Sequence, residues 1–259
     1  METIRLERDG DVLVATIDHP DSSVNAVDER LHRELGELFR TLKTESEARA
    51  VVVTGSGRAF SAGGDMAWLP SMRSPEDIHA LRREGKQIVW DLLDVEIPVV
   101  CGLNGAAAGL GASIALLGDV IVMADSAVIV DPHVKIGLVA GDGGAAIWPL
   151  LLGPLAAKRH LLLGEPLTAA EALRLGVASE VCPGADVAER TMAWARRLAA
   201  GAPFAVQGTK LAVNAQIKQA LLTSFDVSMA SEMTCFLSAD HAEGVDAFVT
   251  GREPAFHGR

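Results

Sequence analysis

Two glycine-rich stretches, GRAFSAGGDMAWL (residues 57–69) and LNGAAAGLGASIALLGD (residues 103–119), decide how this chain folds. Each follows a short apolar run that is typical of a buried strand. In the first stretch, Gly63 and Gly64 allow positive φ angles and let a ligand approach the backbone closely. In the second, an Asn-Gly turn leads into a helix whose first residues are all small, so its unpaired N–H groups are open to an incoming oxygen. Two such turns that face each other would form an oxyanion hole, whereas either turn alone is more often a tight turn without a ligand.

Around these loops, short apolar runs alternate with helical spacing. Apolar runs on both sides of Asp9-Gly10 predict an opening β-hairpin, and leucines at helical spacing predict a helix over residues 28–43. Ser74 followed by Pro75 is a helix start, and that helix should extend to about Leu93. The last part of the chain predicts only helices, at residues 188–200, 204–222, 224–238 and 241–250. The fold class is therefore α/β with an all-helical C-terminal segment.

Composition limits the possible partners. The 259 residues are 49% hydrophobic and 22% charged, which fits a globular protein with a substantial core. A net charge of -11 disfavours nucleic acid and anionic membranes, although it allows an anionic small ligand. Three cysteines without close spacing fit a reducing compartment. We find no signal peptide, and the uncharged residues 97–118 contain too much glycine for a good membrane span, so we expect a cytoplasmic protein.

Five segments together resemble the crotonase superfamily, also called the enoyl-CoA hydratase/isomerase family. The resemblance is colinear over nearly the whole chain, and it implies a crotonase-like ββα superhelix, or spiral. A core over residues 1–200 would hold an acyl-CoA site, and a helical segment over residues 201–259 would form a homotrimer or a dimer of trimers and complete the CoA site. The segments are AFSAGGDM (59–66), NGAAAGLGASIAL (104–116), DPHVKIGLVAGDGGAAIWPLLLG (131–153), GEPLTAAEALRLGVASEV (164–181) and FVTGREPAF (248–256).

The resemblance also implies which residues contact the substrate. The main-chain N–H groups of Gly64 and Leu110 would form the oxyanion hole. The carbonyl of Ala62 would bind the adenine amino group of CoA, and Arg58 would contact a phosphate. Phe248 and Arg252 would approach the adenine from a neighbouring subunit, although surface arginines are often merely solvated.

The residues at the two acid–base positions differ from those of the hydratases. Where the resemblance would place two glutamates, this chain has Ser113 and His133. A serine cannot act as a general base without a partner, so Ser113 could instead bind water or fill space, while a histidine can act as a base. Asp142, flanked by glycines, is our first candidate for moving protons, and the alternative is that it caps a helix starting near Gly144. We do not expect Asp131 to orient His133, on the assumption that the segment is extended and the two side chains diverge.

These residues predict an acyl-CoA-processing enzyme that stabilises a thioester enolate but is not a hydratase with paired glutamates. One alternative is a thioester hydrolase, or another substitution at the acyl group, that uses Asp142. A second alternative is an acyl-CoA-binding protein without catalysis. No motif for a metal, a nucleoside triphosphate or NAD is present, so we expect no permanent cofactor and CoA only as part of the substrate.

Overall fold

A computed structural model describes all 259 residues. Its main sheet has six strands in the order β1-β2-β4-β7-β9-β12. The first two strands form the predicted hairpin and are antiparallel, and every later strand joins its neighbour in parallel. The centre of the sheet is buried on both faces, as parallel sheets require. The strands are β1 (Ile4–Asp9), β2 (Val12–Ile17), β4 (Ala50–Gly55), β7 (Val99–Leu103), β9 (Val120–Ala124) and β12 (Glu180–Cys182).

Short strands after the long ones form two smaller sheets. One has four strands in the order β11-β10-β8-β5, and the other pairs β3 with β6. Long strand, short strand and helix thus recur along the chain, which is the ββα repeat expected for the spiral. The short strands are β3 (Ala26–Val27), β5 (Ala59–Ser61), β6 (Gly63–Gly64), β8 (Ala106–Ala108), β10 (Val128–Val130) and β11 (Leu167–Thr168).

The helices that cover the sheets begin at the residues that local chemistry favours. The Asp28 side chain caps α1, and Ser74 forms a capping box with Asp77 at the start of α2, as the sequence predicts. Helix α3 is short and entirely buried, because its small residues let it pack closely. The helices of this part are α1 (Glu29–Leu42), α2 (Pro75–Asp94), α3 (Leu110–Leu116), α4 (Gly144–Leu152), α5 (Pro154–Leu163), α6 (Ala169–Arg174) and α7 (Val187–Ala199), with 3-10 turns η1 (Leu69–Ser71), η2 (His133–Ile136) and η3 (Gly184–Asp186).

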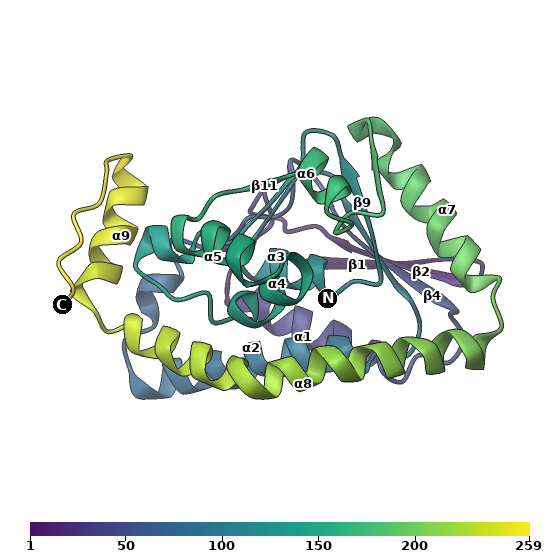
Figure 1. Cartoon of the computed structure of the whole chain (residues 1–259), viewed down its shortest axis with the longest axis horizontal. Helices are drawn as coiled ribbons and strands as arrows, with labels where there is room; N and C mark the ends of the chain where they lie inside the picture. The colour runs from purple at the N-terminus through teal and green to yellow at the C-terminus, as the bar shows by residue number, and fades with distance from the viewer.

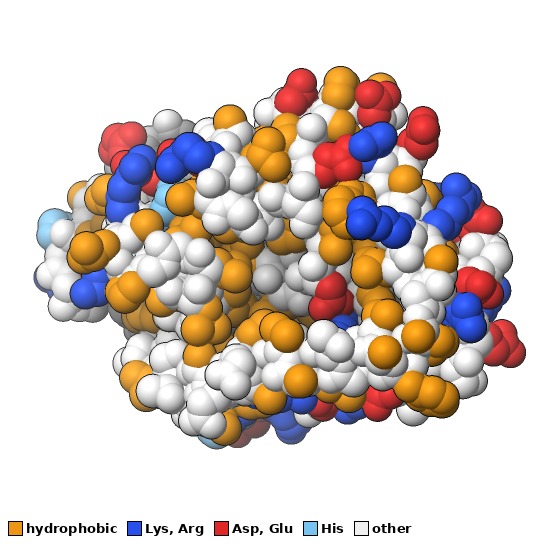
Figure 2. Space-filling view, turned by 45° about the vertical axis from the view of Figure 1, so that its right-hand side comes forward, with side chains coloured by type: hydrophobic (Ala, Val, Ile, Leu, Met, Phe, Trp, Pro, Cys, Tyr) orange, Lys and Arg blue, Asp and Glu red, His pale blue; other side chains and the backbone are white.

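The C-terminal segment consists of one long helix and one short helix. The predicted break near residue 223 is wrong, because α8 (Pro203–Cys235) is continuous over 33 residues. It runs along the bottom of the molecule and packs against α2 and α4, while α9 (Ala239–Thr250) lies at one end against η2 (Figure 1). Apolar side chains recur on the surface along α8 (Figure 2), and they include Phe204, Val213, Leu222 and Val227. None of the helices has the length and apolar character needed to cross a membrane.

Candidate active site

One cavity brings together residues from distant parts of the chain. Its wall includes Gly64 and Leu110 from the two glycine-rich stretches, His133 and Asp142 from the third segment, and Glu232 from α8. The remaining lining is mainly apolar. With its open mouth included it holds about 720 Å³, a size that suits a small-molecule site.

The two glycine turns are pressed against each other at this cavity. Gly63 and Gly109 both have positive φ angles, 77° and 52°. A Cβ atom on Gly63 would lie 2.9 Å from the carbonyl oxygen of Ala108, and one on Gly109 would lie 3.8 Å from the Cα of Gly63. Only glycine fits such an approach. The residues that follow these glycines, Gly64 and Leu110, both line the cavity. Leu110 is the first residue of α3, where a helix leaves its N–H groups unpaired.

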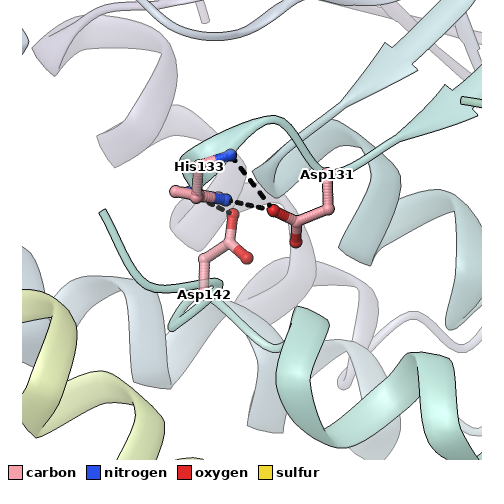
Figure 3. A group of neighbouring side chains, drawn as sticks. All are labelled: Asp131, His133 and Asp142. Atoms are coloured by element: carbon pink, nitrogen blue, oxygen red, sulfur yellow. Dashed lines mark hydrogen bonds and ion pairs between the residues drawn. The ribbon is translucent and has the colours of Figure 1, made fainter. Parts of the chain in front are cut away.

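Asp131 holds His133 in a fixed orientation (Figure 3). Its Oδ1 atom lies 2.6 Å from His133 Nδ1 and also accepts the main-chain N–H of His133 at 3.3 Å. Our expectation that Asp131 would point away is wrong. Residues two apart share a face even in a strand, and here Pro132 turns the chain into the 3-10 turn η2, which brings the side chains closer. The Nδ1–H bond to Asp131 leaves Nε2 facing the cavity.

Two more carboxyl groups face the other edge of the imidazole. His133 Nε2 lies 3.7 Å from Asp142 Oδ2 and 3.7 Å from Glu232 Oε1. Ser113 donates its hydroxyl to Asp142 Oδ1 at 3.2 Å, so it positions the carboxylate. The alternative that Asp142 caps α4 has no capping hydrogen bond behind it, although the Gly144 amide nearby opposes the rise in the pKa of the Asp142 carboxyl. The residue at the cap position itself is Gly143.

Burial and mutual repulsion decide how this cluster is protonated. Burial lowers the pKa of His133, but the charges of Asp131 and Asp142 outweigh this effect and hold that pKa well above its ordinary value. Burial raises the pKa of Asp142, against the opposing attraction of His133. Burial also raises the pKa of Glu232, to about 8. Near neutral pH the site therefore holds an imidazolium together with a neutral carboxylic acid at Glu232.

Sequence reasoning missed Glu232. The residue lies on the buried side of α8, where its neighbours Phe225, Met229 and Met233 are apolar. A carboxyl group on an apolar helix face costs free energy unless it is used or paired. The helical spacing of its apolar neighbours can be recognised in the sequence, so a glutamate on that face could have been identified as a candidate site residue.

The residues expected to bind CoA occupy different surroundings. Ala62 lines the cavity, whereas Arg58 is exposed and donates to Ser23 Oγ at 3.1 Å. Phe248 is exposed on α9, outside the cavity. Arg252 follows α9 and forms ion pairs with carboxylates of its own subunit.

Asp131, His133 and Asp142 also have the spacing of a possible metal site, since one ligand atom from each lies within 4.8 Å of the others. However, the proton between His133 Nδ1 and Asp131 occupies the same space. A metal ion bound there would have to displace this proton.

Comparison with known proteins assigns the chain to a family. A family model described as enoyl-CoA hydratase/isomerase matches residues 7–259. The chain belongs to this family. It is 31% identical to 1,2-epoxyphenylacetyl-CoA isomerase of Escherichia coli strain K12, with all of both chains covered. It is 34% identical to a probable enoyl-CoA hydratase of Rhodobacter capsulatus, over 99% of this chain and 98% of the relative.

Solved structures of the family confirm the crotonase fold. An enoyl-CoA hydratase/isomerase from Mycobacterium paratuberculosis superposes with a TM-score of 0.90 at 37% identity, over 95% of this chain and 98% of the other. A β-diketone hydrolase from the cyanobacterium Anabaena, bound to (S)-3-oxocyclohexyl acetic acid, superposes with a TM-score of 0.85 at 31% identity, over 91% and 94%. The enzyme is therefore an acyl-CoA-processing member of the enoyl-CoA hydratase/isomerase family.

Proposed function

We propose that this enzyme binds an acyl-CoA thioester carbonyl between the N–H groups of Gly64 and Leu110 and forms an enolate there. The observation that carries the proposal is the position of the Gly109 turn. A Cβ atom on Gly109 would lie 3.3 Å from His133 Cε1 and 3.7 Å from Asp142 Oδ2. The proposed oxyanion donors and the proton-transfer groups are therefore close enough to contact the same part of one substrate molecule. Each such donor lowers the barrier by about 3 kcal/mol.

The proton steps follow from the protonation of the cluster. Asp142, which Ser113 orients, accepts the proton from the α-carbon. The imidazolium of His133 beside it stabilises the negative charge left on the enolate. Asp131 keeps the imidazole in position and does not contact the substrate. Glu232 is neutral near pH 7 because its pKa is raised to about 8, so it can return a proton to the enolate at a second carbon. Proton removal at one carbon and return at another is a double-bond isomerisation.

The CoA part of the substrate extends from the cavity mouth. The Ala62 carbonyl, at the cavity wall, accepts the adenine amino group, and Arg58 contacts a phosphate after leaving Ser23. Phe248 and Arg252 complete the adenine site of a neighbouring subunit in a trimer or hexamer. Arg252 must then exchange part of its pairing with Glu243 and Asp246, which exposed ion pairs permit at low cost.

A panel of acyl-CoA thioesters in heavy water, followed by mass spectrometry, tests this proposal. Deuterium at the α-carbon, or a shifted double bond, is the expected result. Asp142→Asn should slow the exchange by about 10²–10⁴-fold, because it removes the general base. Asp226→Asn, an exposed carboxylate paired with Lys86, is the matched control and should leave exchange unchanged. Exchange that survives in Asp142→Asn would contradict the role of Asp142.

A second candidate is hydrolysis at the acyl group, and the similarity to a β-diketone hydrolase favours it. In this reaction Asp142 takes a proton from water beside the imidazolium of His133, and the water oxygen adds to a carbonyl carbon. The bond from that carbon to the leaving group breaks. If the leaving group is an enolate, the N–H groups of Gly64 and Leu110 stabilise it and Glu232 protonates it.

The same panel separates the reactions. Released CoA without α-deuteration indicates thioester hydrolysis, and a shortened acyl chain from a 3-oxoacyl-CoA indicates hydrolysis of a carbon–carbon bond. Thioester binding without any chemical change would favour the non-catalytic alternative.

A further inference from the structure

A second histidine–carboxylate pair faces the same cavity, away from the proton-transfer cluster. His32 on α1 is buried, with 4% of its surface exposed, and it is part of the cavity wall. Its Nδ1 atom lies 3.2 Å from Glu84 Oε2 on α2, and its ring packs against Trp68 with centroids 5.5 Å apart. These contacts fix the orientation of the ring.

The other ring nitrogen of His32 has no partner in the protein. Nε2 of His32 makes no hydrogen bond within the protein. The Nε2 atoms of His19 and His241 are fully enclosed by the protein, whereas Nε2 of His32 is not. It points to the space beside Gly85, because a Cβ atom on that glycine would lie 3.8 Å from it. A polar nitrogen that is held in place, unpaired within the protein and open to the cavity is available as a hydrogen-bond partner for a ligand.

The position of this nitrogen relative to the proton-transfer cluster follows from α8. The same Cβ position on Gly85 lies 3.7 Å from Met229 Cε, and Met229 precedes Glu232 by three residues. Residues three apart leave the same side of a helix about 4.5 Å apart along its axis. Met229 thus separates two polar ends of an otherwise apolar cavity, with Glu232 at one end and His32 at the other.

We propose that His32, held by Glu84, determines specificity by binding a hydroxyl group on the acyl part of the substrate, remote from the thioester. A hydroxyl is the group of choice because it both donates and accepts. When the ring is neutral and its Nδ1–H donates to Glu84, the hydroxyl can donate to Nε2. When the ring is charged, the hydroxyl can accept from Nε2–H. The inference rests on the proposed function, since it assumes that the thioester occupies the end of the cavity near Gly64 and Leu110.

Calorimetric binding of matched thioesters tests the inference without requiring turnover. The probes are ω-hydroxyacyl-CoA thioesters of increasing chain length, each compared with the unsubstituted acyl-CoA of the same length. At the length that reaches His32, the wild-type protein should bind the hydroxylated member about fivefold more tightly, the worth of one hydrogen bond. His32→Phe keeps an aromatic ring against Trp68 and should abolish this preference, while His32→Gln should retain part of it. His79→Phe, an exposed histidine on α2, is the matched control and should bind like the wild type.

The outcomes separate this inference from the proposed function. If both members of every pair bind the wild type equally, the role of His32 is refuted and the proposed function stands. A preference that persists in both His32→Phe and His32→Gln also refutes it, as does a preference for ω-carboxyacyl-CoA in place of the hydroxylated probes. If no thioester binds, the proposed function fails and the inference fails with it.

Discussion

The bond between Asp131 and His133 gives the sharpest test of the cluster, through the substitution Asp131→Asn. This change keeps the shape of the side chain and removes its charge. The bond is 2.6 Å long and Asp131 is 1% exposed, so water cannot replace the lost interaction. A hydrogen bond to a charged group contributes about 1.5–3 kcal/mol. Because one pKa unit corresponds to about 1.4 kcal/mol, the pKa of His133 should fall by about one to two units.

Nuclear magnetic resonance of protein with labelled histidine measures this pKa directly, since the chain has only 7 histidines. The same loss of stabilisation should slow α-proton exchange by about 10- to 150-fold. Stability should change with a definite sign. A histidine whose pKa is raised by folding stabilises the protein most at low pH, and this contribution disappears as pH rises through the folded-state pKa. Asp131→Asn should therefore cost more stability at pH 6 than at pH 9.

Two results would refute the reasoning. One is a His133 pKa that moves by less than about half a unit in Asp131→Asn. Because one pKa unit corresponds to about 1.4 kcal/mol, so small a shift would be well below the expected loss of about 1.5–3 kcal/mol. The other is an equal loss of exchange activity in Asp226→Asn, which would indicate a general effect of removing carboxylates.

Further predictions concern neighbouring groups. Burial raises the Glu232 pKa to about 8, so wild-type stability should fall as pH rises from about 5 to 8, and thermal unfolding of Glu232→Gln should show a flatter dependence. Activity should decline above about pH 8 when Glu232 ionises, and an unchanged alkaline limb in Glu232→Gln would contradict its role as the acid. Gly109→Ala should cost about 1–3 kcal/mol in denaturant unfolding because of its positive φ, and its methyl group beside His133 should reduce exchange activity at least as much as Asp131→Asn does. Burial raises the Cys101 pKa to about 12, so a thiol reagent should label Cys182 and Cys235 first and Cys101 only on unfolding; equal labelling rates would contradict its burial.

Local chemistry explains why much of the fold could be predicted. The opening hairpin, the buried strand β4 and the start of α2 depend on patterns within a few residues, such as alternating valines or Ser74 before Pro75. The continuity of α8 could not be read in this way. Its polar positions near residue 223 are compatible with a helix end, and the packing of α8 against α2 and α4 involves residues far away in the sequence.

The same distinction applies to the site. His133, Asp142 and Ser113 lie in segments whose resemblance to a known family could be recognised, and the structure brings them together. Glu232 and His32 come from helices without such motifs. Their proposed roles depend on contacts between distant positions, 99 apart for Glu232 and His133 (232−133) and 52 apart for His32 and Glu84, and sequence spacing carries no information about such contacts.

The origin of Glu232 on α8 has a consequence for the newly made protein. His133, Asp131 and Asp142 leave the ribosome first, and at ordinary synthesis rates the 90 positions between Asp142 and Glu232 take about 5–20 s longer. Until α8 docks, that side of the cluster is open to water, and a hydrated carboxyl or imidazole titrates near its ordinary pKa. The buried surroundings of this cluster are therefore completed only when α8 has been made and docked, so an unfinished chain can form the two glycine turns before the cluster has its final protonation.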